Sequence, residues 1–308
     1  MAKPLLRLGT RGSPLALAQA RIVAAALAGA HRDLAAQGAI LVEPIRTTGD
    51  KVQDRPLAEI GGKGLFTEEI EKALLAGDID IAVHSLKDMP TMLPPGLHIG
   101  AVLEREDPRD VLFSKGGGGI DALPRGARVG TASLRRQAVL LNKRPDLKIG
   151  PLRGNVETRL RKLQEGQVDA TVLALAGLKR LGLGTAGAAV LSVDDMLPAP
   201  AQGAICVESR VNDNRVATLL ARIDHKPSSI AVAAERALLA ALDGSCRTPI
   251  GGLAVFTSNG SLYLRALVAL PDGTKLWRAE RKGGAADAES MGSDAGRELR
   301  RAAGALFK

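Results

Sequence analysis

The alternation of short β-like runs with longer helical runs, from residue 5 to about 103, most constrains the fold of this chain. Strands are expected at Leu5–Leu8, Ile40–Ile45 and Ile79–Val83, and a helix is expected from Pro14 to about Leu27. Ser13 is placed to cap this helix, and Pro14 suits its first turn. This alternation predicts an α/β architecture with a largely parallel sheet.

A second α/β unit is expected from about Asp110, with strands at Arg128–Gly130 and Ala170–Leu175. The Pro- and Gly-rich stretch Leu197–Gly203 then returns the chain toward the first unit, where a strand is expected at Ala204–Glu208. Because the chain crosses twice between two lobes, we expect a hinge between them.

The composition changes after Lys226. A helix is expected at Ser228–Leu242, followed by alternating runs with hairpin signals at Asn259-Gly260 and Asp272-Gly273. This pattern predicts a small α+β domain at the C-terminus. The expected division is domain 1 at residues 1–104 plus 200–222, domain 2 at 105–199 and domain 3 at 223–308.

The formal net charge of +9 favours anionic partners, whether nucleic acid, lipid headgroups or acidic small molecules. Six aromatic residues in 308 are too few for the stacking platforms that hold single-stranded nucleic acid. No stretch approaches the roughly 20 apolar residues of a membrane helix, and no signal peptide is recognisable. With only two cysteines and no metal-ligand spacing, the sequence predicts a cytoplasmic protein without a metal site.

Basic residues are concentrated in one segment. Residues 125–162 contain eleven Lys and Arg side chains against two acids. Several stand where helices are expected to begin, at Ser133–Arg136 and Arg153–Val156, where the helix dipole favours anions. The segment is either a solvated basic face or a binding surface for carboxylate or phosphate, and the placement at helix starts favours binding.

Two short stretches contain reactive groups. His84-Ser-Leu-Lys-Asp88 follows a buried strand, so Asp88 is either a carboxylate that stabilises a developing cation or a turn residue that bonds nearby backbone. Cys246 lies beside Arg247, an arrangement that can lower the pKa of a thiol. Cys206 lies within an apolar strand pattern and is expected to pack as a small hydrophobic residue.

Seven strings, in order along the chain, resemble one enzyme family. They are Leu8-Gly-Thr-Arg-Gly-Ser-Pro-Leu-Ala-Leu17, Gly61-Gly-Lys-Gly-Leu-Phe66, Asp80-Ile-Ala-Val-His-Ser-Leu-Lys-Asp-Met-Pro90, Glu104-Arg-Glu-Asp-Pro-Arg-Asp110, Gly130-Thr-Ala-Ser-Leu-Arg-Arg-Gln137, Leu152-Arg-Gly-Asn-Val156 and Gly244-Ser-Cys246. The family is porphobilinogen deaminase, also called hydroxymethylbilane synthase, and the resemblance runs from about residue 5 to the end.

The resemblance implies a transferase of tetrapyrrole (haem, chlorophyll, cobalamin) biosynthesis. Such an enzyme joins four porphobilinogen molecules head to tail, with loss of ammonia, and releases linear hydroxymethylbilane. Cys246 matches the family cysteine that carries a dipyrromethane cofactor through a thioether, and a nucleophilic thiol suits that attachment. Asp88 matches the family's catalytic aspartate, whose carboxylate would offset the positive charge of the reacting pyrrole.

The resemblance also implies a set of side chains that bind carboxylates, because each pyrrole ring carries an acetate and a propionate. Those matched to the cofactor, besides Cys246, are Ser85, Lys87, Ser133, Arg135 and Arg136. Those matched to the substrate and the growing chain are Arg11, Ser13, Lys63, Arg153, Arg159 and Arg180. The implied fold is two lobes like those of periplasmic binding proteins plus the third domain.

The expected partners are therefore porphobilinogen and the growing polypyrrole chain, without nucleic acid or membrane, and the family expectation is a monomer. Two other functions compete with this interpretation. A non-enzymatic two-lobed protein that binds acidic small molecules explains the lobes and the basic segment, but leaves Cys246 and Asp88 without a role. A nucleic-acid-binding protein explains the charge alone.

Overall fold

The computed structural model describes residues 4–51, 64–243 and 248–307 and forms two compact units. The first comprises the chain up to Glu106 together with Ala204–Ser229, and the second comprises Asp107–Gly203 together with the chain from Ile230 onward. The chain therefore leaves the first unit, builds part of the second and returns once, as the two crossing segments predicted. The three-domain division stays a prediction.

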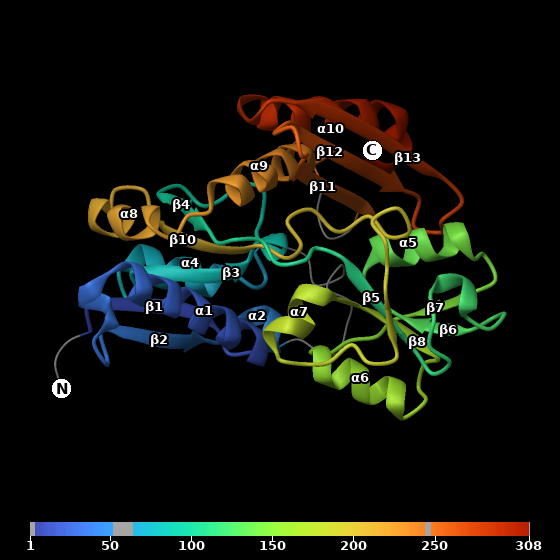
Figure 1. The fold of residues 1–308 in the computed structure, drawn as a ribbon, viewed down its shortest axis with the longest axis horizontal. Helices are drawn as coiled ribbons and strands as arrows, with labels where there is room; N and C mark the ends of the chain where they lie inside the picture. The colour runs from blue at the N-terminus through green and yellow to red at the C-terminus, as the bar shows by residue number, and fades with distance from the viewer. Residues whose placement is uncertain (1–3, 52–63, 244–247, 308) are drawn as a thin grey trace. The chain divides into compact units, whose positions relative to one another are not determined.

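The first unit is built on a five-stranded sheet of order β2-β1-β3-β10-β4 (Figure 1). Its strands are β1 (Leu6–Arg11), β2 (Ile40–Ile45), β3 (Ile81–Ser85), β4 (Leu97–Val102) and β10 (Ile205–Arg210). Its helices are α1 (Pro14–Ala30), α2 (Thr48–Lys51), α4 (Glu68–Ala76) and α8 (Asn214–Ala221), with short 3-10 turns η1 (Arg32–Ala35) and η2 (Leu86–Asp88).

The second unit contains a five-stranded sheet with the equivalent order, β7-β6-β8-β5-β9. Its strands are β5 (Asp110–Ser114), β6 (Arg128–Gly130), β7 (Lys148–Gly150), β8 (Ala170–Ala174) and β9 (Ala188–Val190). Its helices are α5 (Leu134–Lys143), α6 (Val156–Gln164) and α7 (Leu175–Arg180), with the turn η3 (Ile120–Ala122).

The expectation of largely parallel sheets holds for four of the five strands in each sheet, and one strand runs against them. In the first sheet β1 is parallel to β2 and β3, but β10 is antiparallel to both β3 and β4. In the second sheet β5 takes the place of β10 and is antiparallel to β8 and β9. The reversed strand is β10 in the first sheet and β5 in the second. Each comes directly after the chain has crossed from the other unit, and not after a helix of its own unit. It therefore enters its sheet in the opposite direction.

The C-terminal part of the second unit is a three-stranded antiparallel sheet with two long helices. The strands β11 (Ile250–Phe256), β12 (Leu262–Ala269) and β13 (Leu276–Gly283) are joined by turns at the predicted positions. The helices α9 (Lys226–Ala241) and α10 (Ala288–Ala302), the latter red in Figure 1, share one apolar core with this sheet, and the turns η4 (Ala285–Asp287) and η5 (Gly304–Phe307) flank α10. The predicted α/β class with two lobes and a small α+β part is confirmed.

The core of the first unit lies between its sheet and its helices. Leu8, Val23, Leu27 and Ile81 are fully buried between the sheet and α1, and Ile70 with its neighbours packs α4 on the sheet. Burying each large aliphatic side chain contributes roughly 1.5–3 kcal/mol. Within the described ranges, no helix has both the length and the apolarity needed to cross a membrane.

Candidate active site

The predicted site residues of the first unit lie at one edge of its sheet. Strands β1 and β3 are parallel neighbours, with Leu8 opposite Ile81, so the residues that end both strands lie side by side. Arg11 ends β1 and Ser85 ends β3. Ligand sites in open α/β sheets occur at this carboxyl edge, as the sequence predicted for the loop that carries Asp88.

Asp88 presents a free carboxylate at that edge. It closes the single turn η2, in which Leu86 is buried, and Met89 directly after the turn is also buried. Asp88 itself is exposed and makes no hydrogen bond or ion pair with any described residue. The alternative role of Asp88, a turn residue that bonds nearby backbone, is therefore not what the structure shows.

The other predicted residues of this edge are tied to their surroundings. The Ser85 hydroxyl exchanges hydrogen bonds of 2.8 and 3.0 Å with the side-chain amide of Gln19 on α1. Ser13 caps α1 as predicted, because its hydroxyl accepts a hydrogen bond from the Ala16 N–H. The Arg11 guanidinium lies 4.0 Å from the centre of the Phe66 ring, and the Lys87 side chain is half-buried beside Asp88.

The predicted residues of the second unit gather at the equivalent edge of its sheet. Ser133 follows β6 and caps α5, where its hydroxyl accepts a 3.4 Å hydrogen bond from the N–H of Arg136. Arg135 and Arg136 form the first turn of α5, but only 4% and 6% of their surfaces are exposed. They are therefore buried cations rather than members of a solvated basic face.

One buried carboxylate lies between these two guanidinium groups. Asp110, the first residue of β5, accepts hydrogen bonds of 2.7 Å from Arg135 Nη2 and from Arg136 Nη2, one on each carboxylate oxygen. Arg135 Nη1 donates to the Leu197 carbonyl and Arg136 Nη1 to the Val172 carbonyl. Burial by itself would raise the pKa of Asp110, but the two guanidinium charges outweigh it and hold the pKa well below its usual value.

Three further predicted arginines lie near this edge. Arg153 follows β7 and precedes α6, and Arg159 on α6 donates to the Gly154 carbonyl at 2.9 Å. Gly154 has a φ of +115°, and a Cβ there would lie 2.6 Å from Thr158 Cγ2, so only glycine makes this turn. Arg180 ends α7 and donates to the Gly203 carbonyl at 2.6 Å.

Two predicted residues, Lys63 and Cys246, lie outside the described residues. Cys206, the other cysteine, is fully buried in β10, which confirms that it packs within the core. No group of three or more His, Cys, Asp or Glu side chains in the described part of the chain is arranged to hold a metal ion.

His84, which precedes the Asp88 loop, belongs to a buried ionisable cluster. Its Nε2 lies 3.2 Å from Glu208 Oε2 on β10, and both residues are buried. Glu71 on α4 is also buried, and its Oε1 has no hydrogen-bond partner among the described residues. Burial raises the pKa of Glu71, and the negative charge of Glu208 adds to that shift. This cluster is part of the core and does not reach the exposed Asp88 carboxylate.

The raised pKa of Glu71 predicts a pH-dependent loss of stability. Because the native state favours the protonated carboxyl, the stability that Glu71 contributes is present below its usual pKa of 4.5 and is lost as the pH rises through the raised value. We expect Glu71→Gln to raise the Tm at pH 7.5 by about 2–4 °C, with less effect at pH 4.5. Thermal unfolding at both pH values checks this, with the exposed Glu68→Gln on the same helix as the control. An equal shift at both pH values would contradict the prediction.

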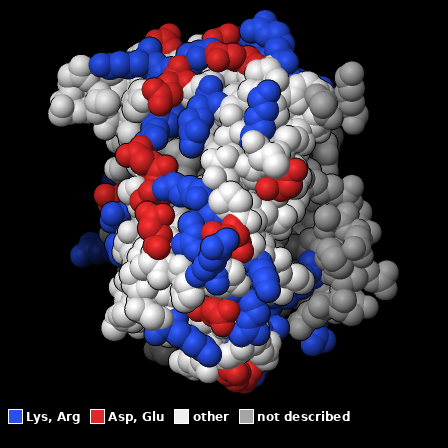
Figure 2. Space-filling view, turned by 90° about the vertical axis from the view of Figure 1, so that its right-hand side faces the viewer, with Lys and Arg blue, Asp and Glu red and all other residues white. Residues whose placement is uncertain are grey.

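Ion pairs neutralise part of the basic segment 125–162. Arg128 pairs with Asp169, Arg144 with Asp146 and Arg161 with Glu165. Figure 2 shows a face on which Lys and Arg alternate with Asp and Glu rather than forming one unbroken patch. An extended phosphate-binding surface would require an unbroken basic stripe, so the charge of this segment gives little support to nucleic-acid binding.

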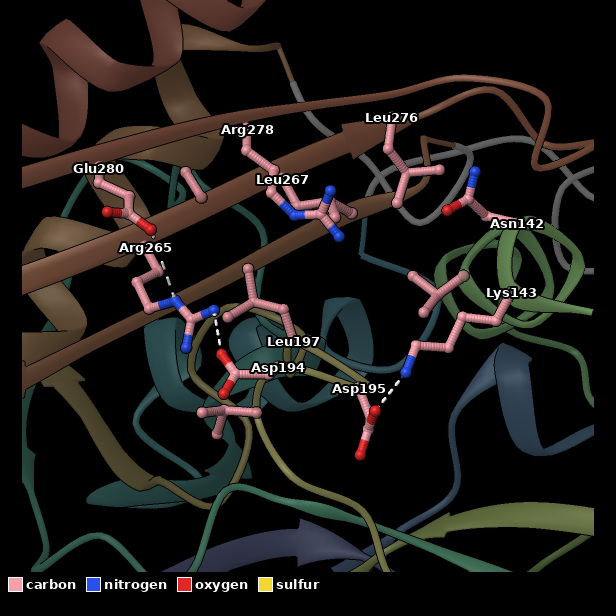
Figure 3. Close-up of a pocket in the computed structure, with 13 residues that line it drawn as sticks. Asn142, Lys143, Asp194, Asp195, Leu197, Arg265, Leu267, Leu276, Arg278 and Glu280 are labelled. Carbon is pink, nitrogen blue, oxygen red and sulfur yellow. Dashed lines mark hydrogen bonds and ion pairs between the residues drawn. The ribbon is translucent and has the colours of Figure 1, made fainter. Parts of the chain in front are cut away.

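A separate cavity of about 50 Å³ lies in the second unit between the C-terminal half of α5 and strands β12 and β13 (Figure 3). It is bordered by ion pairs, Arg265 with Asp194 at 2.6 Å and Lys143 with Asp195. The predicted site residues do not line it among the described parts of the chain. Arg135 and Arg136 lie at the opposite end of α5 from Lys143.

Comparison with known proteins gives matches over nearly the whole chain. Residues 6–218 match the family model described as porphobilinogen deaminase, dipyromethane cofactor binding domain, and residues 229–301 match the model of the porphobilinogen deaminase C-terminal domain. The chain belongs to the porphobilinogen deaminase family. The porphobilinogen deaminase of Nitrobacter winogradskyi is 55% identical over 304 residues, which cover 98% of this chain and 95% of that protein. The chloroplastic enzyme of Pisum sativum is 52% identical over 306 residues, 98% of this chain and 83% of that protein.

The enzyme class and the cofactor that the resemblance implied are confirmed. The family is that of a transferase of tetrapyrrole biosynthesis with a dipyrromethane cofactor, and the alternative of a non-enzymatic binding protein is not favoured.

Among solved structures, a periplasmic binding protein of an ABC transporter from Brucella ovis with glutathione bound is similar at a TM-score of 0.41 and 14% identity, over 77% of this chain and 68% of that chain.

The described residues fit the cofactor expected in a porphobilinogen deaminase. The Nε atoms of Arg135 and Arg136 are buried without a hydrogen-bond partner among the described residues. A buried N–H without a partner costs about 1–3 kcal/mol, more for a charged group. Guanidinium groups bind carboxylates in a bidentate manner, and a dipyrromethane carries acetate and propionate groups. These two Nε atoms are therefore available to a carboxylate of the cofactor.

Sequence reasoning assigned no role to two residues of this porphobilinogen deaminase site. Asp110 ends one of the strings that resemble the family, and Gln202 lies in the crossing segment, where its side-chain amide donates to Asp110 Oδ1 at 2.9 Å. The sequence does carry a signal for Asp110, because this acid stands directly before the apolar residues Val111–Phe113 of a strand. The sequence offers no comparable signal that Gln202 lies beside it.

Proposed function

We propose that this chain joins porphobilinogen molecules head to tail, and that Asp88, Cys246 and the arginines at the carboxyl edge of each sheet act in that reaction. Head-to-tail joining to give hydroxymethylbilane is the activity of its family. The observation that carries the assignment of the site is the pair of buried guanidinium groups of Arg135 and Arg136, which share one carboxylate and retain unpartnered Nε atoms.

Each group has a defined task in this proposal. The bound dipyrromethane supplies the primer to which incoming pyrroles are joined. Arg135 and Arg136 hold its carboxylates, with Ser133, Ser85 and Lys87 nearby in their own units, and Cys246 forms the thioether. Arg11, Ser13, Lys63, Arg153, Arg159 and Arg180 bind carboxylates of the substrate and the growing chain.

Asp88 acts on the reacting pyrrole. As the amino group of the porphobilinogen aminomethyl substituent leaves as ammonia, the methylene carbon stays on the ring and positive charge develops there, and an exposed carboxylate without a partner among the described residues stabilises it. The same carboxylate accepts a hydrogen bond from the pyrrole N–H and so orients the ring.

The covalent cofactor gives the direct test. The intact mass of the purified protein should exceed the chain mass by two porphobilinogen units less their ammonia, and Cys246→Ser should lose the whole excess. Cys206→Ala is the matched control, because Cys206 is buried in β10, and it should keep the excess. If incubation with porphobilinogen leaves the wild-type chain at its bare mass, or if Cys246→Ser keeps the adduct, the assignment of Cys246 fails.

We also propose that the protein is a cytoplasmic monomer. Its two cysteines fit a reducing compartment, and monomers are the expectation for its family. Light scattering after gel filtration measures the molar mass, and a value near twice 32.0 kDa would contradict a monomer.

A further inference from the structure

We propose that Asp110 is a positioning residue of the cofactor site, whose carboxylate fixes the Arg135 and Arg136 guanidinium groups in the orientation that receives a carboxylate. This inference rests on the proposed function, in which those two arginines hold the cofactor. Asp110 is fully buried, and each of its oxygens accepts from a different arginine at 2.7 Å.

The cluster of Asp110, Arg135 and Arg136 contains one negative and two positive charges. Two guanidinium groups side by side repel each other, and that repulsion acts together with burial to lower the pKa of Arg135. Asp110 compensates one positive charge, so the cluster retains a net charge of about +1 at neutral pH. A second carboxylate is needed to neutralise it, and the unpartnered Nε atoms offer the remaining donors.

Gln202 donates a third hydrogen bond to Asp110. Its Nε2 donates to Asp110 Oδ1 at 2.9 Å and to the Pro108 carbonyl at 2.7 Å, so it links the stretch Leu197–Gly203 to the residues at the start of β5. The preceding residue, Ala201, has a φ of +61°, an unfavourable conformation for a residue with a Cβ. The buried Glu235 accepts a 2.5 Å hydrogen bond from the Ala201 N–H and so maintains this turn.

The test replaces the carboxylate by the isosteric amide in Asp110→Asn. The two arginines donate to different carboxylate oxygens. The amide keeps only one of these two acceptor atoms, and its NH₂ group, a donor, faces the other guanidinium group, so the two arginines lose their common anchor. We expect the fraction of protein carrying the cofactor, measured by intact mass on folded protein after incubation with porphobilinogen, to fall to about one tenth of wild type or less. Asp146→Asn is the matched control, since it breaks an Arg–Asp pair of the same unit away from the site, and it should load normally.

A charge swap separates positioning from mere folding. In Asp110→Asn/Gln202→Glu the carboxylate returns on the adjacent side chain, and we expect cofactor loading to rise severalfold above that of Asp110→Asn. A role in folding alone would lower the Tm of Asp110→Asn but leave the folded fraction fully loaded, and that result would overturn the proposal. If Arg135→Met and Arg136→Met also load normally, the failure lies instead in the proposed function of the arginines.

A second variant covers the case in which Asp110→Asn does not fold. Gln202→Met keeps the Asp110 charge and removes its third hydrogen bond. We expect the fraction of folded protein that carries the cofactor to fall about 3- to 10-fold, because the guanidinium pair is less well oriented. A lowered Tm together with normal loading would assign the Asp110 network to folding and overturn its positioning role.

Discussion

Asp88→Asn is expected to lower kcat for the consumption of porphobilinogen by about 100-fold or more. The amide keeps the size of the side chain but removes the negative charge that offsets the developing positive charge on the pyrrole. Because the Asp88 side chain is exposed, its replacement removes no hydrogen bond or ion pair with the described residues. The Tm and the cofactor mass should therefore match those of wild type.

The control for Asp88 lies at the other end of the same strand. Asp78 is an exposed carboxylate just before β3, at the opposite edge of the first sheet. Asp78→Asn should keep wild-type turnover in the same assay. Near-normal turnover of Asp88→Asn, measured on protein shown by mass to carry the cofactor, would remove the catalytic role of Asp88.

Arg135→His and Arg136→His are each expected to abolish chain assembly and prevent cofactor loading. An imidazole is too short to reach both Asp110 and the backbone carbonyl that each arginine also contacts, Leu197 for Arg135 and Val172 for Arg136. It also lacks the two parallel N–H donors with which a guanidinium group binds a carboxylate. Each change also leaves Asp110, a fully buried carboxylate, with a single guanidinium partner. Removing one partner of a buried ion pair costs about 3–5 kcal/mol, so the Tm should fall as well.

Arg144→His separates this effect from a general loss of stability. Arg144 also pairs with an aspartate, Asp146, and donates to backbone carbonyls in the same unit, but it is not a predicted site residue. It should lower the Tm while the folded protein still carries the cofactor and turns over. Wild-type loading and rates in both Arg135→His and Arg136→His would contradict the carboxylate-binding role of this pair.

The sequence predicted the local elements of the fold well. The strands at Ile40–Ile45 and Arg128–Gly130 have the predicted bounds, and the turns at Asn259-Gly260 and Asp272-Gly273 join the strands of the small antiparallel sheet. Alternation, helix caps and turn residues act between neighbours in the chain, which is why they can be recognised without the fold. Strand direction could not be recognised in this way, because it depends on where a distant crossing segment enters each sheet.

For the site, the sequence alone determined the residue types and the family. The strings that resemble porphobilinogen deaminase singled out Asp88, Arg135 and Arg136, and the structure places them at the carboxyl edges of their two sheets. Sequence could not distinguish an arginine on a solvated basic face from one that is 4% exposed and paired to an acid. Both look the same in a basic segment of the chain.

Only the tertiary structure decided which charges compensate each other. Asp110 is 25 residues from Arg135 and 92 from Gln202, yet all three meet in one buried network. His84 and Glu208 are 124 residues apart and also lie in direct contact. Such contacts depend on which strands become neighbours in the sheets, and that order is a property of the whole folded chain. Burial then sets the consequence, because a charge removed from water must find a partner wherever the fold supplies one.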